Sequence, residues 1–154
     1  MAKRYWLMKS EEDVYSIRSL ELDGVTCWEG VRNYEARNLM RDRMRVGDEV
    51  LFYHSNTKPP GVAGLAKVIR EAYPDHFAFD KKNSYYDPKS DPENPRWFMV
   101  DVEFVEAFPE VVTLNEIKAK VELAEMALVK RARLSVQPVT KEEFQVIRKM
   151  GRRR

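Results

Sequence analysis

Aromatic rings stand beside amide, hydroxyl and carboxyl side chains in expected loops and at the ends of expected strands. The rings belong to Trp28, Tyr34, Tyr53, Tyr85, Tyr86 and Trp97, and the polar groups beside them to Ser10, Asn33, His54, Ser55, Asn56 and Asp101. A nucleobase site needs this combination, because rings stack on the face of a base while polar groups bind its edge. A methyl group on the base would add apolar area worth about 0.8 kcal/mol if buried.

The alternative interpretation is that these rings belong to the hydrophobic core. We adopt it for Trp6 and Phe98, which lie in apolar runs typical of strands. For Trp28 and Trp97 the sequence leaves both interpretations open.

Catalytic chemistry has weaker support. Cys27, His54 and an aspartate such as Asp101 have the side-chain types of a nucleophile, a base and an acid, but nothing in their spacing brings them together. A lone cysteine is more often a small buried residue, and it excludes an internal disulfide. Residues 61–64 lack the lysine of a phosphate-binding loop, and no cysteine–histidine spacing indicates zinc. We therefore predict no metal and no cofactor.

Basic residues are clustered although the net charge is only +2. The clusters are Arg32, Arg37, Arg41, Arg43 and Arg45; Lys130, Arg131 and Arg133; and a basic C-terminal tail from about residue 149. Each cluster alone is typical of a solvated surface, and together they permit a polyanionic partner. The apolar runs are too short to cross a membrane and no signal peptide is present, so we expect a protein that is not secreted, cytoplasmic if bacterial and nuclear if eukaryotic.

The 154 residues, 44% of them hydrophobic, fit a single domain with its own core. Apolar or alternating runs predict strands at residues 5–8, 49–54, 62–69, 96–105 and 134–139. Helices are expected from Ser10 to about Leu20, from Glu35 to the turn at residues 46–48, and after Thr113 and Thr140. Residues 21–34, 56–61 and 73–95 are predicted loops. This order favours an α+β fold built on a small β-barrel or a curled sheet.

Several of these segments together resemble the EVE domain of thymocyte nuclear protein-like proteins. They are Tyr5–Glu11, Trp28–Asn38, Gly47–Asn56, Tyr85–Ser90, Arg96–Trp97 and Leu134–Val139, which occur in the family's order between about residues 4 and 148. One departure is Glu11-Glu12, where the family often has Glu-Pro. The resemblance implies a PUA-like fold, a small β-barrel flanked by helices, and a relation to YTH domains, which bind methylated adenine in RNA.

The resemblance implies a non-catalytic reader of a modified base in DNA or RNA. Trp28 would then be a stacking wall, with Ser10 and Asn33 binding the base edge and Tyr85 and Tyr86 forming the opposite wall. Tyr53, His54, Ser55 and Asn56 would shape the floor and rim, with Trp97 and Asp101 as further candidates. Phosphate contacts would come from Lys9, Arg32, Arg37 and Arg41. Residues 26–34, TCWEGVRNY, would form the lip of the pocket, where Gly30 permits the backbone turn.

Two alternatives remain beside the reader. One is an enzyme, a hydrolase or deaminase, that acts on a modified base or nucleoside with His54 and either Asp101 or Cys27. The other is a scaffold whose pocket takes a small apolar metabolite. The sequence names neither the modification nor the oligomeric state, and we expect the chain to act through a protein effector that it does not identify.

Overall fold

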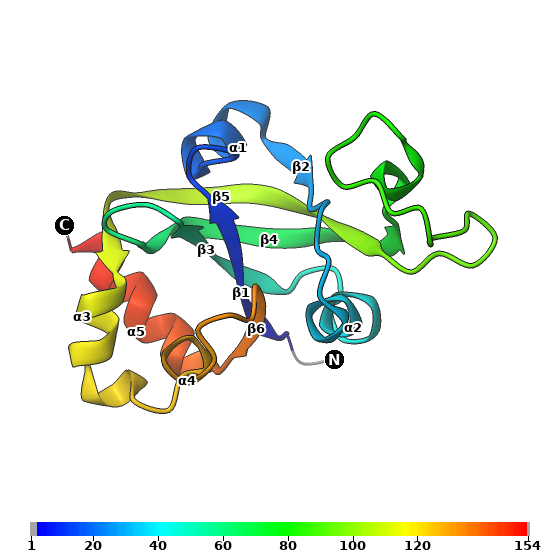
Figure 1. The fold of residues 1–154 in the computed structure, drawn as a ribbon. Coiled ribbons are helices and arrows are strands. Elements are labelled where there is room, and N and C mark those ends of the chain that lie inside the picture. Colours follow the sequence, from blue (N-terminus) through cyan, green and yellow to red (C-terminus); the bar gives the residue numbers. More distant parts are fainter. Residues whose placement is uncertain (1–2, 154) are drawn as a thin grey trace.

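The computed structural model describes residues 3–153, in which six strands form one mixed sheet (Figure 1). Their order across the sheet is β2-β5-β4-β3-β1-β6. The strands are β1 (Tyr5–Glu11), β2 (Val25–Cys27), β3 (Glu49–Ser55), β4 (Gly61–Pro74), β5 (Phe98–Thr113) and β6 (Val136–Val139). The helices are α1 (Ile17–Asp23), α2 (Tyr34–Asp42), α3 (Leu114–Ala119), α4 (Ala127–Lys130) and α5 (Lys141–Arg152), with the 3-10 turns η1 (His76–Phe79) and η2 (Val121–Leu123).

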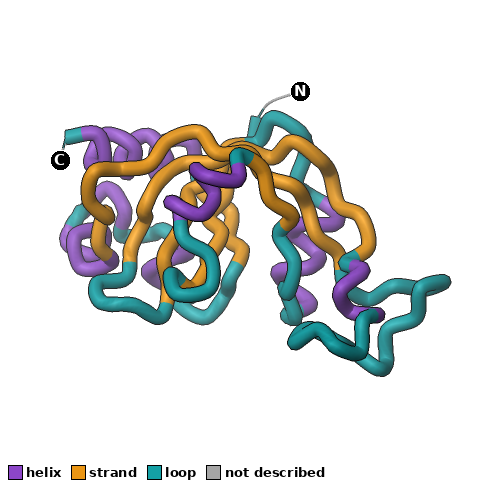
Figure 2. The backbone as a smooth tube through the Cα atoms, turned by 90° about the horizontal axis from the view of Figure 1, so that it is seen from above, coloured by secondary structure: helices purple, strands orange, loops and turns teal. Residues whose placement is uncertain are grey.

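The predicted α+β class is confirmed, but the closed small barrel is wrong. The edge strands β2 and β6 lie at opposite ends of the strand order, so the sheet stays open in the described part of the chain. Its curvature comes from the long neighbours β4 and β5, whose pairing register shifts at four places. Such irregularities bend a strand and increase its twist. Figure 2 shows the strands arching across the molecule rather than lying flat.

Alternating side chains of the central strands pack on opposite faces of the sheet, as the two-residue period of a strand requires. On β1, Trp6 and Met8 belong to one core cluster and Leu7 to the other. The first cluster is covered by α1, α2 and the segment with Trp28, the second by α3, α4 and α5. Because both faces are covered, the central strands are almost continuously apolar.

The first helix begins later than the sequence predicted. The segment Ser10-Glu11 continues β1, where Ser10 pairs with His54 of β3, so a helix starting at Ser10 is wrong. The helix α1 begins at Ile17, and the Ser16 hydroxyl accepts the backbone N–H of Ser19 as its cap. Pairing along a whole parallel ladder outweighs a local capping signal, whose worth is typically about 1 kcal/mol.

The strands β1 and β3 are parallel, so the chain between them must cross over the sheet. This crossover carries the edge strand β2, together with α1 and α2, which cover the face with the first core cluster. The lip segment 26–34, predicted as part of a loop, spans the end of β2 and the turn into α2.

At the C-terminal end, the predicted helix starts are confirmed. The side chains of Thr113 and Thr140 each accept the backbone N–H of the residue three positions on. In return, the backbone N–H of each threonine donates to the carboxylate of that residue, which is a glutamate in both cases. The helix α5 continues to Arg152, whose guanidinium pairs with Glu106 at 2.8 Å, so residues 149–152 are helical where we expected a tail.

Candidate functional site

A cavity of about 460 Å³ opens where the end of β1 meets the lip segment. Its walls come from five residues between Lys9 and Tyr15 (all but Glu12 and Asp13), from Thr26 to Arg32, and from Ser55, Tyr85 and Ser135. Five separate parts of the chain therefore meet there. Ligand sites in proteins commonly measure about 300–1,000 Å³, so this hollow is of a size that takes a small flat molecule.

The Trp28 side chain lies between the core and this cavity. Only 8% of it is exposed, and its ring meets Phe52 edge-on with centroids 5.4 Å apart. Its backbone N–H donates to the Val100 carbonyl at 2.8 Å, which ties the lip to β5. Trp28 is thus both a core residue and part of the cavity wall, so the core interpretation and the cavity interpretation of its sequence both apply.

The Tyr85 ring packs directly over Gly30, and both residues line the cavity. Gly30 has a φ of +82°, and a Cβ placed there would lie 2.4 Å from Tyr85 Cζ. Glycine is therefore needed for two reasons, the left-handed backbone and the close approach of the ring. This contact brings a residue of the segment between η1 and β5 onto the lip.

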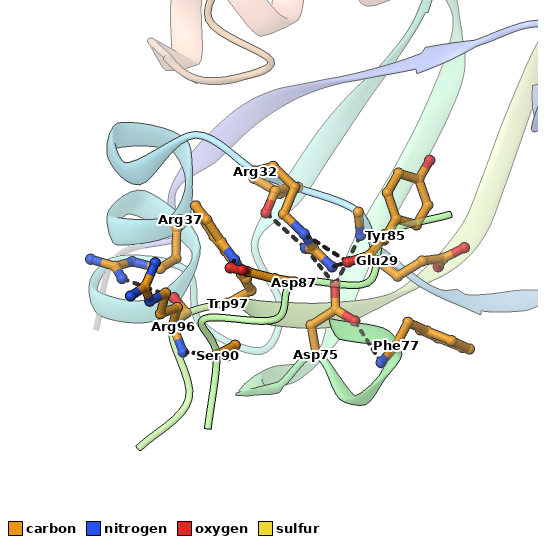
Figure 3. Close-up of polar contacts among 12 residues, drawn as sticks. Glu29, Arg32, Arg37, Asp75, Phe77, Tyr85, Asp87, Ser90, Arg96 and Trp97 are labelled. Carbon is orange, nitrogen blue, oxygen red and sulfur yellow. Dashed lines mark hydrogen bonds and ion pairs between the residues drawn. The ribbon is translucent and has the colours of Figure 1, made fainter. Parts of the chain in front are cut away.

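Arg32 and Asp75 hold that contact in place (Figure 3). The Asp75 carboxylate is fully buried, and its Oδ2 accepts the backbone N–H of Gly30 at 2.9 Å and Nη1 of Arg32 at 3.0 Å. Nη2 of Arg32 donates to the Tyr85 carbonyl at 2.7 Å, and the guanidinium lies 5.5 Å from the Tyr85 ring. Arg32 lines the cavity, but Nε also donates to the Tyr85 carbonyl and Nη1 to the Val31 carbonyl, so most of its donors are already used.

Ser10 presents acceptor lone pairs at the cavity. Its hydroxyl donates to the backbone carbonyl of Tyr15 at 2.6 Å, so its single proton is already used. The Tyr15 hydroxyl in turn donates to Asp23 at 2.8 Å, and burial raises the pKa of this phenol to about 12. Both groups are thereby fixed as neutral hydrogen-bonding partners.

Cys27 and Glu29 lie on the lip beside Trp28. The Cys27 thiol donates to Glu29 Oε2 at 3.4 Å. Burial, and after it the charge of Glu29, raises the pKa of the thiol to about 11. The thiol is therefore protonated at neutral pH and is a poor nucleophile there.

Six of the residues predicted to contact the base or its phosphates line the cavity, and they are Lys9, Ser10, Trp28, Arg32, Ser55 and Tyr85. The others lie outside its lining. Asn33 caps α2, where its side-chain oxygen accepts the backbone N–H of Ala36. Tyr53 is buried in the second core cluster, on the opposite face of the sheet, and Asn56 is an exposed turn residue with a φ of 52°.

His54, Trp97 and Asp101 have structural partners instead. The His54 ring accepts the backbone N–H of Ile17 on Nε2 at 3.0 Å, and burial lowers its pKa. Trp97 donates to Asp87 at 2.6 Å (Figure 3), and this bond lowers the pKa of that carboxyl group. Asp101 accepts the Tyr73 hydroxyl at 2.5 Å.

Tyr86 and two of the predicted phosphate contacts also lie outside the cavity lining. Tyr86 is adjacent to Tyr85 and 36% exposed. Nη1 of Arg37 donates to the Arg96 carbonyl at 2.8 Å (Figure 3), and Arg41 pairs with Asp42.

Lys9 connects the cavity to a second, basic hollow. Its ammonium donates to the Ala132 carbonyl at 2.5 Å, and burial lowers its pKa. The neighbouring hollow, of about 300 Å³, is lined by Lys130, Arg131 and Arg133 among others. Arg131 pairs with Glu35 at 2.7 Å, whereas Arg133 is exposed and makes no ion pair within residues 3–153.

Sequence reasoning missed several cavity residues, including Glu11, Val14, Tyr15 and Ser135. Glu11 ends β1 and residues 12–15 follow it directly, and assigning residues 11–15 to a helix hid their place at the mouth. Val14 offered one signal, since it is an apolar side chain among acids and is 67% exposed.

In the described residues, no group of three or more histidine, cysteine or acidic side chains is arranged to hold a metal ion. Within the same range, every helix is too short or too polar to span a membrane.

Comparison with known proteins gives consistent matches. The EVE domain family matches residues 4–150. Human thymocyte nuclear protein 1 is 46% identical over 162 residues, covering 93% of this chain and 72% of that protein. The human THYN1 protein, solved in complex with DNA that contains 5-methylcytosine, superposes with a TM-score of 0.90 at 45% identity, covering 97% of this chain and 98% of that one. The YTH domain of Zygosaccharomyces rouxii MRB1, solved with N6-methyladenosine RNA, shares the fold with a TM-score of 0.55 at 14% identity, over 97% of this chain and 87% of that one.

Proposed function

The chain belongs to the EVE domain family, and we propose that it is a non-catalytic module that binds one modified base of a nucleic acid. The cavity beside Trp28 carries this proposal, because it places two aromatic rings and fixed polar groups around a hollow of about 460 Å³. The human THYN1 protein, 45% identical in sequence, was solved in complex with DNA that contains 5-methylcytosine. We assign the fold to the PUA-like class, with its sheet left open.

Trp28 and Tyr85 would bind the faces of the base. Each stacking ring contributes about 1–3 kcal/mol. Extracting a base from a duplex costs a few kcal/mol, so a single-stranded or already flipped base is the preferred ligand. Both rings are held before binding, Trp28 by Phe52 and Val100 and Tyr85 by Gly30 and Arg32, which lowers the entropy lost on binding.

Ser10 would bind the edge of the base as an acceptor. Since its proton goes to the Tyr15 carbonyl, its lone pairs suit the exocyclic amino group of cytosine or adenine. The apolar side chains of Val14 and Val31 also line the cavity and would cover a methyl group. If the methyl is fully buried, its contribution of about 0.8 kcal/mol corresponds to about fourfold in affinity.

Lys9 and Arg133 would contact the phosphates that flank the base. They border the two adjoining hollows, and Arg133 has no competing carboxylate partner within residues 3–153. Phosphate contacts of this kind position the strand and make affinity depend on salt.

The three side chains considered for catalysis, those of Cys27, His54 and Asp101, are either protonated or already hydrogen-bonded, which supports a non-catalytic role. The Cys27 thiol stays protonated at neutral pH, and the His54 lone pair on Nε2 is occupied by the Ile17 N–H. Asp101 is bonded to Tyr73. A general base needs a free lone pair within reach of its substrate.

A titration with two matched oligonucleotides tests the proposal. Two single-stranded DNAs that differ only in one 5-methyl group on cytosine are titrated into the full chain by fluorescence anisotropy. We expect the methylated strand to bind about fourfold more tightly. Equal affinities would refute a reader of this base, and new product masses in the mixture would refute the non-catalytic assignment.

Tyr85→Ala and Tyr86→Ala form a matched pair for locating the site. The two tyrosines are adjacent, but only Tyr85 lines the cavity. Tyr85→Ala should weaken binding by about tenfold, within the range of one lost stacking ring, while Tyr86→Ala should stay close to the parent affinity. Equal losses in the two variants would contradict the placement of the base against Tyr85.

A further inference from the structure

A second large hollow lies near the N-terminal end of β1, away from the cavity beside Trp28. It has a volume of about 910 Å³ and lies between α2 on one side and β6 with the start of α5 on the other. Trp6 belongs to this groove and Ser10 to the first cavity. At about 3.3 Å per strand residue, these two positions are roughly 13 Å apart along β1. Both hollows can therefore be occupied at the same time.

The floor of the groove is apolar and held in place. It is formed by Tyr5, Trp6, Leu39, Pro138 and Val139. Trp6 Nε1 donates to Asp48 Oδ2 at 2.9 Å, and this buried carboxylate also accepts the backbone N–H groups of Arg4 and Arg45 at 3.0 Å. A floor fixed in this way needs little reorganisation when an apolar side chain binds against it.

The rim of the groove is entirely basic. Lys3, Arg4, Arg43 and Lys141 complete its lining, which contains no carboxylate. Lys3 pairs with Glu49 at 3.3 Å. The side chains of Arg4, Arg43 and Lys141 are exposed and make no ion pair with any residue between 3 and 153. Three cations thus surround an apolar floor without partners from the chain itself.

This combination favours a peptide over a nucleic-acid backbone. Phosphates would use the rim but gain nothing from the apolar floor, whereas an acidic segment with an apolar side chain uses both. The edge strand β6 carries Pro138, which has no N–H to offer, so addition of a strand to this edge is disfavoured. Recognition would therefore take place through side chains.

We propose that this groove docks an acidic segment of a partner protein, with an apolar side chain of that segment seated against Leu39 and Pro138. The proposal does not depend on the base-binding function, since the two hollows lie at different ends of β1. Such a site would let a chain that holds a nucleic acid in one cavity recruit a second protein in the other.

Two labelled peptides of equal charge test the groove. In one, glutamates alternate with leucines, and in the other with serines. Each is titrated into the full chain and into the double variant Arg43→Glu/Lys141→Glu by fluorescence anisotropy. The leucine peptide should bind the parent chain at least about tenfold more tightly than the serine peptide, because it alone buries apolar side chains. The double variant should weaken it by about tenfold, because two rim attractions become repulsions.

The same variant is titrated with the methylated oligonucleotide, and its melting curve is compared with that of the parent chain. Both substitutions are at exposed positions, so the melting temperature should be retained. Unchanged oligonucleotide affinity together with weaker peptide binding supports the proposal. Equal affinity for the two peptides, or peptide binding that ignores the charge reversal, overturns it. A parallel loss of oligonucleotide affinity also overturns it, since the groove would then belong to the nucleic-acid path. Failure of the methylated strand to bind the parent chain would bear on the first cavity alone.

Discussion

Replacing Gly30 by alanine tests how the cavity wall is built. Gly30 has a φ of +82°, and the new Cβ would lie 2.4 Å from Tyr85 Cζ and 2.7 Å from both neighbouring ring carbons. Carbon atoms in contact prefer about 3.5–4.0 Å, so the ring must move by about 1 Å or more. The substitution therefore combines backbone strain with displacement of one aromatic wall.

The two costs can be estimated separately. Alanine in the left-handed region costs about 1–2 kcal/mol of unfolding free energy. Displacing the ring weakens its interaction with the Arg32 guanidinium, 5.5 Å away, which adds about 0.5–1 kcal/mol. For binding, a misplaced Tyr85 forfeits much of a stacking contact worth about 1–3 kcal/mol, or about tenfold in affinity.

Gly47→Ala is the matched control. Gly47 has a φ of +95°, and a Cβ there would meet nothing within 4 Å. It shares the backbone strain of the first variant without any steric conflict, and it lies in the turn before β3 rather than in the cavity lining. Denaturant unfolding gives the stability of both variants, and anisotropy with the methylated oligonucleotide gives their affinity.

Gly30→Ala should be less stable than Gly47→Ala by about 0.5–1 kcal/mol and should bind about tenfold more weakly. Gly47→Ala should keep the parent affinity. If the two variants lose the same stability and both bind like the parent chain, then Tyr85 does not pack on Gly30 as a wall of the site, and the reasoning fails.

Three further predictions concern a buried histidine, a phosphate contact and a helix cap. Burial lowers the folded-state pKa of His54, so the unfolded chain takes up a proton first and the stability should fall as the pH drops below about 6.5. In His54→Gln the amide oxygen can still accept the Ile17 N–H, so melting curves of this variant should lack that pH-dependent loss of stability. An equal fall of stability with pH in the variant and the parent chain would contradict the prediction. Arg133→Ala should reduce the salt slope of oligonucleotide binding by about 1 while Lys149→Ala, on α5, does not; identical slopes would exclude Arg133 as a phosphate contact. Thr140→Ala should cost about 1 kcal/mol of unfolding free energy without changing affinity, and no loss would mean that this cap is dispensable.

The sequence predicted most elements because their signals are local. The apolar runs at residues 49–54 and 62–69 became β3 and β4, and the threonine caps marked the starts of α3 and α5. Ser10 misled because its capping pattern is local too, whereas its place in β1 depends on pairing with His54 far along the chain. Closure of the sheet is likewise a property of distant edges, so the order of short strands among helices favours a barrel or a curled sheet without showing whether β2 and β6 meet.

The cavity lining was predictable where a ring in an irregular segment gave the signal. It was unpredictable where the direction in which a side chain points decides whether the residue lines the cavity. Trp28 and Tyr85 stood out as rings in irregular segments, and both line the cavity. Tyr86 shares that signal but does not line it, because neighbouring residues in a turn point in different directions. Asn33 carried a second signal, the preference of asparagine for the N-cap, and the structure shows it in that role.

The cavity can form only if β1 and β3 pair in the correct register. Ser10 lies on the cavity only while it pairs with His54, because a slip of one residue would turn every side chain of β1 to the opposite face. The lip is carried on the crossover between the same two strands. A misaligned chain could thus keep its helices and still be unable to hold a ligand, which makes ligand retention a more stringent criterion of correct folding than helical content.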